Sequence, residues 1–176
     1  MLNEISKCFS DGDIKSFFRN GLNFMFKYSD LQDMNNINDL FINAPFCVIL
    51  IEEHLNSGHW VSLMKYDNGT IEQFDSYSGR IDAELKYVSN RQKTKLNEAG
   101  NHLTQLLDQY DGPVIYNHYR FQKLANGINT CGRWCVLRIL MFLDGYNIDQ
   151  FVKKFKWLKG LYRLKNDQLV CVLIPQ

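Results

Sequence analysis

The chain has 176 residues, of which 45% are hydrophobic, 22% are charged and only 3 are prolines, as in one folded domain over residues 1–176 with a substantial core. Its 20 Lys and Arg residues balance 19 Asp and Glu residues. This balance argues against nucleic acid or an anionic membrane as the main partner.

The first half of the chain predicts helices around a strand and a hairpin. Short helices with Asp or Ser caps are expected within residues 11–26 and 29–34. The run "FCVILIEE", residues 46–53, is rich in β-branched and aromatic residues and predicts a buried strand. Residues 59–77 form two apolar-polar runs around Asp67-Asn68-Gly69, which is a strong hairpin signal.

Helices dominate the expectations for the second half. Leucines at helical spacing predict a long surface helix over 82–110, interrupted near Gly100, and residues 112–122 then return to strand character. Residues 131–145 are apolar nearly all round and predict a buried helix that ends near Gly145. An amphipathic helix follows over 147–158, with the basic run Lys153 to Lys159 on its solvated face. The last segment, 167–174, fits strand and helix equally, and the whole pattern is that of an α+β domain.

The N-terminus and the apolar runs indicate a soluble intracellular protein. "MLNEISKCFSDGD" carries charges and lacks the apolar core of a secretory signal. The longest apolar run, "FCVILI", is far shorter than the ~20 residues of a membrane span. The five cysteines are an odd number and form no Cys-x-x-Cys pair, so neither a disulfide framework nor structural zinc is expected. We expect no metal or cofactor, and the cysteines then serve catalysis or packing.

Cys131 stands at the predicted start of the buried helix. Unpaired backbone N–H groups and the positive end of the helix dipole converge there and favour the thiolate, which is the nucleophilic form. Gly132 lets a substrate carbonyl approach the backbone, and the Cys131 N–H can serve a developing oxyanion. An inert buried cysteine explains the segment equally well. Cys135, one turn further on, is interpreted as core packing.

A thiol nucleophile needs a base, and the base needs a third group that fixes its tautomer. His59 heads the first hairpin strand, and Asp75 lies in the second. With a three-residue loop over 67–69 and Gly69 left-handed, Val61 faces Asp75, and His59 is its diagonal neighbour on the same face, with Cβ atoms ~7–8 Å apart. A two-residue loop would put them on opposite faces, so the chemistry favours the longer loop. The alternatives are a half-buried strand histidine and a strand-end aspartate.

Four short segments in order resemble one enzyme clan: "GHW", "FDS", a glutamine and "NTCGRWC". The order His, Asp, Gln, Cys is similar to that of the Ulp/adenain clan of cysteine proteases, which includes SUMO-deconjugating enzymes and the adenovirus maturation protease. The resemblance spans residues 45–145, and the small size of the chain fits the compact viral and virophage members best. It implies a papain-like, adenain-type fold, with a mixed central sheet flanked by helices and the nucleophile at a buried helix N-terminus.

The resemblance also implies a role for each matching residue. His59 would be the general base and then the general acid, Asp75 would orient it, and Cys131 would attack the substrate carbonyl. Trp60 would shield the site or wall the substrate channel, beside Gly132.

The same resemblance implies that Gln122 contributes to the oxyanion hole. Its side-chain amide would donate beside the backbone N–H of Cys131. Gln122 lies further before Cys131 than in the relatives, with "KLANGINT" between them. Asn126 or Asn129 is therefore an alternative source of the amide.

The implied activity is cleavage of an extended polypeptide at Gly-Gly-X or Gly-X sites through a thioester. A viral member would process capsid or core precursors in the host cytoplasm, act as a monomer and be packaged in the virion. Three alternatives stay open. They are a deconjugating peptidase for ubiquitin-like or SUMO-like modifiers, a triad acetyltransferase that uses acetyl-CoA, and an idle relative that only binds a partner.

Overall fold

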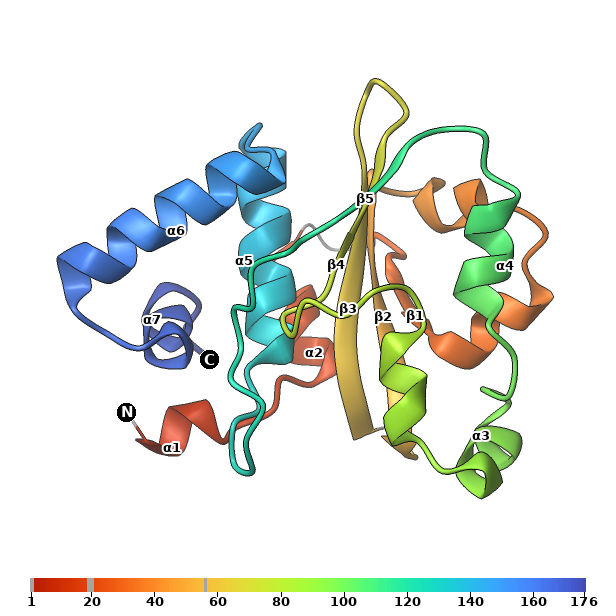
Figure 1. Ribbon diagram of the computed structural model, residues 1–176, viewed down its shortest axis with the longest axis horizontal. Coiled ribbons are helices and arrows are strands. Elements are labelled where there is room, and N and C mark those ends of the chain that lie inside the picture. The colour runs from red at the N-terminus through yellow and green to blue at the C-terminus, as the bar shows by residue number, and fades with distance from the viewer. Residues whose placement is uncertain (1, 19–20, 56) are drawn as a thin grey trace. The chain divides into compact units, whose positions relative to one another are not determined.

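The computed structural model describes residues 2–18, 21–55 and 57–176 (Figure 1). The chain divides into two compact units. The sheet unit comprises Gly21–Asp75 and Gly79–Tyr116, and the helical unit comprises Met1–Asn20, Ser76–Ser78 and Asn117–Gln176. The expectation of one domain stays a prediction, and each unit is described by itself.

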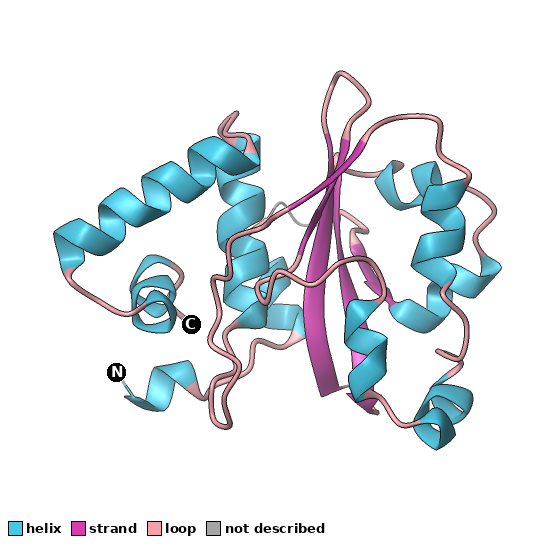
Figure 2. Ribbon diagram, viewed as in Figure 1, coloured by secondary structure: helices cyan, strands magenta, loops and turns pink. Residues whose placement is uncertain are grey.

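The sheet unit is built on a mixed five-stranded sheet in the order β1-β2-β3-β4-β5 (Figure 2). Its inner pairs, β2 with β3 and β3 with β4, are antiparallel, whereas the outer pairs are parallel. This mixed sheet, with helices beside it, confirms the α+β class. The strands are β1 (Met25–Lys27), β2 (Phe46–His54), β3 (Ser57–Lys65), β4 (Ile71–Phe74) and β5 (Val114–Tyr116).

The two edge strands correct the sequence-based expectations. Met25–Lys27 falls in and just beyond the segment expected to be helical, but it pairs with Val48–Leu50 and completes the sheet edge. Pairing with a distant strand overrides local propensity there. Residues 19–20 of that segment lie outside the described residues. Of the expected strand over 112–122, only Val114–Tyr116 forms, because its parallel partner β4 is short.

The β3–β4 hairpin has the predicted three-residue loop. Ser62 pairs with Phe74, so Val61 stands opposite Asp75 one step further along the register. The Gly69 N–H donates to the Tyr66 carbonyl over 2.9 Å, and Gly69 has the left-handed φ of 85°. A side chain is disfavoured in this conformation, which is why glycine closes the turn.

Helices cover one face of this sheet with an apolar core. Alternate side chains of β2 and β3 point into it, among them Ile49 and Leu63, and meet Leu103 and Leu106 of a helix. Each fully buried side chain of this kind stabilises the fold by about 1.5–3 kcal/mol. The helices are η1 (Tyr28–Asp33), η2 (Ile37–Phe41), η3 (Ala83–Tyr87), α3 (Asn90–Leu96) and α4 (His102–Asp108).

The long helix expected over 82–110 is broken into η3, α3 and α4. Asn97 adopts a left-handed φ of 58° and ends α3. Gly100 lies in the connection to α4, so the predicted interruption there is confirmed.

The helical unit contains α1 (Leu2–Ile5), α2 (Asp11–Lys15), α5 (Cys131–Leu143), α6 (Ile148–Tyr162) and α7 (Asn166–Leu173). The first nine residues of α5 are all buried. The ring of Phe121 packs on that of Trp134, with centroids 5.1 Å apart, and on that of Phe151, with centroids 5.0 Å apart. The helices predicted over 131–145 and 147–158 are confirmed, and the undecided segment 167–174 is helical.

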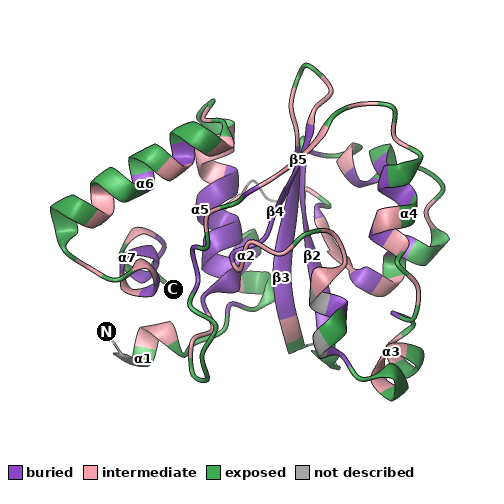
Figure 3. Ribbon diagram, in the orientation of Figure 1, coloured by how far each residue is buried: buried purple, intermediate pink, exposed green. Residues whose placement is uncertain are grey.

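The outer face of α6 is solvated, as Figure 3 shows, with Lys153, Lys154 and Lys156 exposed. The basic run therefore lies where the amphipathic pattern predicts. In the described part of the chain, no helix is long and apolar enough to cross a membrane.

Candidate active site

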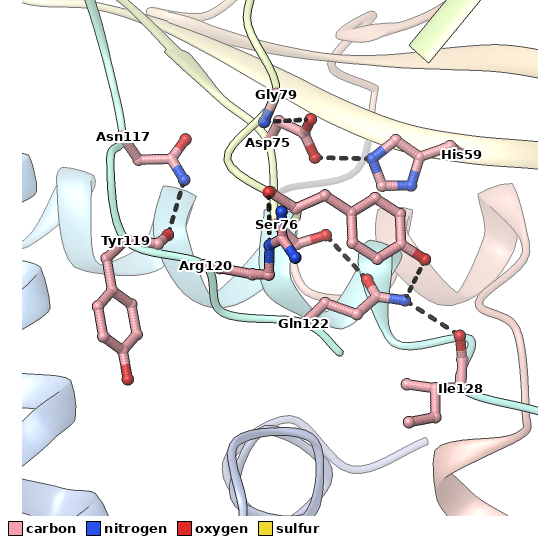
Figure 4. A network of polar contacts seen from close by, with 10 residues as sticks. His59, Asp75, Ser76, Gly79, Asn117, Tyr119, Arg120, Gln122 and Ile128 are labelled. Atoms are coloured by element: carbon pink, nitrogen blue, oxygen red, sulfur yellow. Dashed lines mark hydrogen bonds and ion pairs between the residues drawn. The ribbon is translucent and has the colours of Figure 1, made fainter. Parts of the chain in front are cut away.

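His59 and Asp75 form a buried pair in the sheet unit (Figure 4). His59 lies on β3, and Asp75 follows the last residue of β4. The imidazole Nε2 is 2.8 Å from the Asp75 Oδ1, and the two residues are 5% and 0% exposed. The hairpin register and the hydrogen bond thus agree with the diagonal placement predicted from the turn.

The contacts of Asp75 define the tautomer of His59. An ionised carboxylate only accepts hydrogen bonds, so Nε2 must carry the proton that it donates. In the neutral ring Nδ1 is then the basic nitrogen. The second carboxylate oxygen accepts the Gly79 N–H at 2.9 Å, which holds the carboxylate in place. These contacts therefore hold the imidazole in one orientation and one tautomer.

Cys131 is the first residue of α5, as predicted. The preceding Thr130 is the N-cap residue, but its side chain makes no cap hydrogen bond to the helix. Its hydroxyl donates instead to Asp167. Cys131 is 9% exposed at the positive end of a 13-residue helix. Such a position favours thiolate over thiol.

The other cysteines lie in environments that suit inert thiols. Cys135 is fully buried in α5, which agrees with its interpretation as packing. Desolvation by burial raises the pKa of the Cys8, Cys47 and Cys171 thiols. Little reactive thiolate is expected from these three at neutral pH.

Gln122 is 1% exposed, and each polar atom of its amide has a partner (Figure 4). Its Nε2 donates to the Tyr77 hydroxyl at 2.9 Å and to the Ile128 carbonyl at 3.1 Å. Its Oε1 accepts the Ser76 hydroxyl at 2.8 Å. The amide is therefore rigidly held. To donate to a substrate oxygen, Nε2 must give up one of its two hydrogen bonds, to Tyr77 or to Ile128.

The alternative amides differ from Gln122 in burial and contacts. Asn126 is exposed in the loop. Asn129 donates through Nδ2 to the Ser6 carbonyl at 2.8 Å, and its backbone N–H donates to the Ile5 carbonyl. The Asn129 amide therefore ties the loop to the N-terminal segment.

The two residues expected beside the substrate are both buried. Trp60 stands on β3 opposite Leu50 of β2. Gly132 is the second residue of α5. Their roles at a substrate channel stay predictions.

Asp167 is a buried acid that sequence reasoning missed. It is 5% exposed in the first turn of α7. Its Oδ1 accepts the Thr130 hydroxyl at 2.6 Å, and its Oδ2 accepts the Lys123 N–H at 3.1 Å. The only signal in the sequence is an acid directly before the apolar run "LVCVLI", where it also reads as an ordinary first-turn residue.

The predicted site residues fall into two groups. His59 and Asp75 belong to the sheet unit, and Cys131 and Gln122 to the helical unit. Among the described residues, no three His, Cys, Asp or Glu side chains gather in an arrangement that could hold a metal ion.

Comparison with known proteins shows the family to which this α+β chain belongs. No protein-family model matches the chain. The chain is 37% identical over 147 residues to the uncharacterized protein V9 of the Sputnik virophage, an alignment that covers 83% of this chain and 82% of V9. The chain belongs to the family of V9.

Two solved structures are also similar to the chain. One is the central domain of the uncharacterized Lpg1148 protein from Legionella pneumophila, at 15% identity and a TM-score of 0.40, over 97% of this chain and 99% of that one. The other is ChlaDub1 from Chlamydia trachomatis, at 14% identity and a TM-score of 0.34, over 85% of this chain and 65% of that one.

Proposed function

We propose that this protein is a thiol endopeptidase of the Ulp/adenain clan with Cys131 as nucleophile, His59 as base and Asp75 as the group that orients the base. The observation that carries the proposal is the buried hydrogen bond between His59 Nε2 and Asp75 Oδ1 at 2.8 Å. It makes Nδ1 the nitrogen that accepts a proton. The position of Cys131 at the start of α5 supports the same reading.

The proposed reaction has two acyl-transfer steps and requires the Cys131 thiol and the His59 imidazole to meet in the working enzyme. His59 Nδ1 takes the thiol proton, and the Cys131 sulfur bonds to the peptide carbonyl carbon. The C–N bond then breaks as His59 returns that proton to the leaving amine. Water, deprotonated by His59, attacks the thioester, and the released thiolate regains a proton. The Cys131 N–H and the Gln122 amide would bind the oxyanion in both steps.

The proposed substrate is an extended polypeptide with a Gly-Gly-X or Gly-X site. Membership in the family of a virophage protein supports a viral role, and a capsid or core precursor in the host cytoplasm is the natural substrate for such an enzyme. We expect the enzyme to act as a monomer and to be packaged with the virion.

A mechanism-based label tests the proposal directly. The full chain is incubated with a Gly-Gly peptide that ends in a thiol-reactive electrophile, and intact mass and peptide mapping locate the adduct. A single adduct on Cys131, lost in Cys131→Ala and strongly slowed in His59→Ala, supports the proposal. His118→Ala is the matched control, because this histidine is exposed and lies outside the contacts described above. Its labelling rate should equal that of the wild type.

Other outcomes overturn the proposal. If His59→Ala is labelled at the wild-type rate, His59 is not the base. If adducts are spread over the other cysteines, Cys131 is not the specific nucleophile. An active enzyme that cleaves modifier fusions but no precursor peptide would be a deconjugating peptidase. Hydrolysis of acetyl-CoA would favour the acetyltransferase, and no reaction with any of these would favour an idle binding protein.

A further inference from the structure

The chain between Gln122 and Cys131 does not by itself hold these residues at a fixed separation. It passes through residues 123–127, which are all exposed, and Gly127 has a left-handed φ of 77°. Two oxyanion donors must nevertheless be held to within a fraction of an ångström, because misplacement by about 1 Å can cost a hundredfold in rate. The Gln122 amide contacts the loop at the Ile128 carbonyl, over 3.1 Å, and a further contact is needed to fix Thr130 and Cys131 relative to it.

The first turn of α7 contacts both ends. The Asp167 carboxylate accepts the Lys123 N–H at 3.1 Å at one end and the Thr130 hydroxyl at 2.6 Å at the other. The neighbouring Asn166 donates through Nδ2 to the Phe121 carbonyl at 2.8 Å. The backbone is thus bound immediately before and immediately after Gln122, and the Thr130 side chain is bound immediately before Cys131.

An ordinary role in the helix does not account for this arrangement. An acid in a first helical turn stabilises the helix dipole equally well when it is exposed to water. Asp167 is instead 5% exposed, and burying a carboxylate is costly unless hydrogen bonds replace its hydration. Those bonds come from the loop and from α5, including the Trp134 indole N–H at 3.4 Å. The carboxylate therefore links three segments of the helical unit.

We propose that Asn166 and Asp167 form a positioning clamp that sets the distance between the Gln122 amide and the Cys131 N–H and thereby builds the oxyanion hole. The inference rests on the proposed function and adds to it two residues that touch no substrate. Asp167 acts through Thr130 and Lys123, and Asn166 acts through the backbone beside Gln122.

Two reactions of the same thiol separate positioning from folding. Peptide hydrolysis develops an oxyanion, whereas alkylation by iodoacetamide displaces iodide at carbon and develops none. Thr130→Val removes the hydroxyl at nearly constant volume and should lower kcat for a Gly-Gly-X peptide about ten- to a hundredfold. KM and the alkylation rate of Cys131 should change less than about threefold. Thr130→Ser keeps the hydroxyl and should retain most of the activity.

Asp167→Asn should act like Thr130→Val, because an amide cannot accept both hydrogen bonds and keep its donor satisfied. Val172→Ala is the control on α7. Val172 is 47% exposed near the other end of the helix and lies outside the clamp contacts, so both reactions should keep their rates. If Asp167→Asn fails to fold, the Thr130 pair still decides the outcome.

A readout that needs no activity separates this inference from the proposed function. Hydrogen exchange of the Gln122 side-chain amide, followed by NMR, should accelerate at least tenfold in Thr130→Val and Asp167→Asn and stay unchanged in Thr130→Ser. If exchange is faster in these two variants but the wild type hydrolyses no peptide, the clamp is supported and the proposed peptidase activity is rejected. Unchanged exchange, unchanged kcat, or a parallel fall of kcat and alkylation would overturn the clamp.

Discussion

Asp75→Asn should invert the tautomer of His59. The two oxygens of Asp75 accept the His59 Nε2–H at 2.8 Å and the Gly79 N–H at 2.9 Å. Asparagine has the same shape but offers one acceptor and one donor. The backbone N–H of Gly79 cannot change, whereas an imidazole can move its proton from one nitrogen to the other. The amide oxygen should therefore turn to Gly79 and the amide NH2 to His59, which forces the proton onto Nδ1.

The cost of this change in the proposed reaction is large. Nδ1 must accept the thiol proton, and a protonated Nδ1 cannot do so. The same substitution in a Ser-His-Asp triad, where it also imposes the wrong tautomer, lowers kcat by about 10⁴-fold. That factor corresponds to about 5.5 kcal/mol of transition-state stabilisation. Because the polar contacts are exchanged rather than left empty, the free energy of unfolding should fall by only about 1 kcal/mol.

Two measurements check the reasoning. The ¹⁵N chemical shifts of His59 distinguish a protonated from an unprotonated ring nitrogen, and they should interchange between the wild type and Asp75→Asn. Peptide hydrolysis then gives kcat for both proteins. A variant that keeps its proton on Nε2 would refute the tautomer argument. An inverted tautomer with undiminished kcat would refute the assignment of His59 as the base.

Three further predictions concern buried polar groups. Burial raises the pKa of Glu98 from an ordinary 4.5 to about 7, so its contribution to stability is full below pH 4.5 and is lost as the pH rises through 7. In urea unfolding, the free energy of unfolding of Glu98→Gln relative to that of the wild type should therefore rise by about 3 kcal/mol between pH 4.5 and 8. A difference that does not depend on pH would contradict this. Tyr28→Phe removes a buried hydroxyl that donates to Asp82 at 2.6 Å, and the free energy of unfolding should fall by about 1–3 kcal/mol. Arg133→Lys should destabilise the helical unit by about 3 kcal/mol, because a lysine cannot replace the guanidinium bonds to the carbonyls of residues 174 and 7. Thermal unfolding that matches the wild type would contradict either of these two.

Features that depend on neighbouring residues could be predicted from the sequence. The Asp67-Asn68-Gly69 loop and the register of β3 with β4 follow from turn chemistry, because a left-handed glycine imposes one geometry on the flanking strands. That register puts His59 and Asp75 on one face. The start of a helix at Cys131 follows from the change from Gly, Asn and Thr to an apolar run.

Features that depend on distant residues could not be predicted in this way. Met25–Lys27 is a strand only because β2 offers it an edge, and nothing local requires it. The partners of the Gln122 amide come from residues 76–77 and 128, and only the folded chain brings them to it.

The sequence by itself thus determined the hairpin that pairs His59 with Asp75 and the helix that begins at Cys131. Only the tertiary structure decided that Asp167 is a buried link between the ends of a loop rather than a solvated first-turn acid. The physical reason is the separation along the chain over which each kind of interaction acts. Turn geometry and helix periodicity act over a few residues, whereas the hydrogen bonds of Asp167 join groups that lie more than thirty residues apart in the chain.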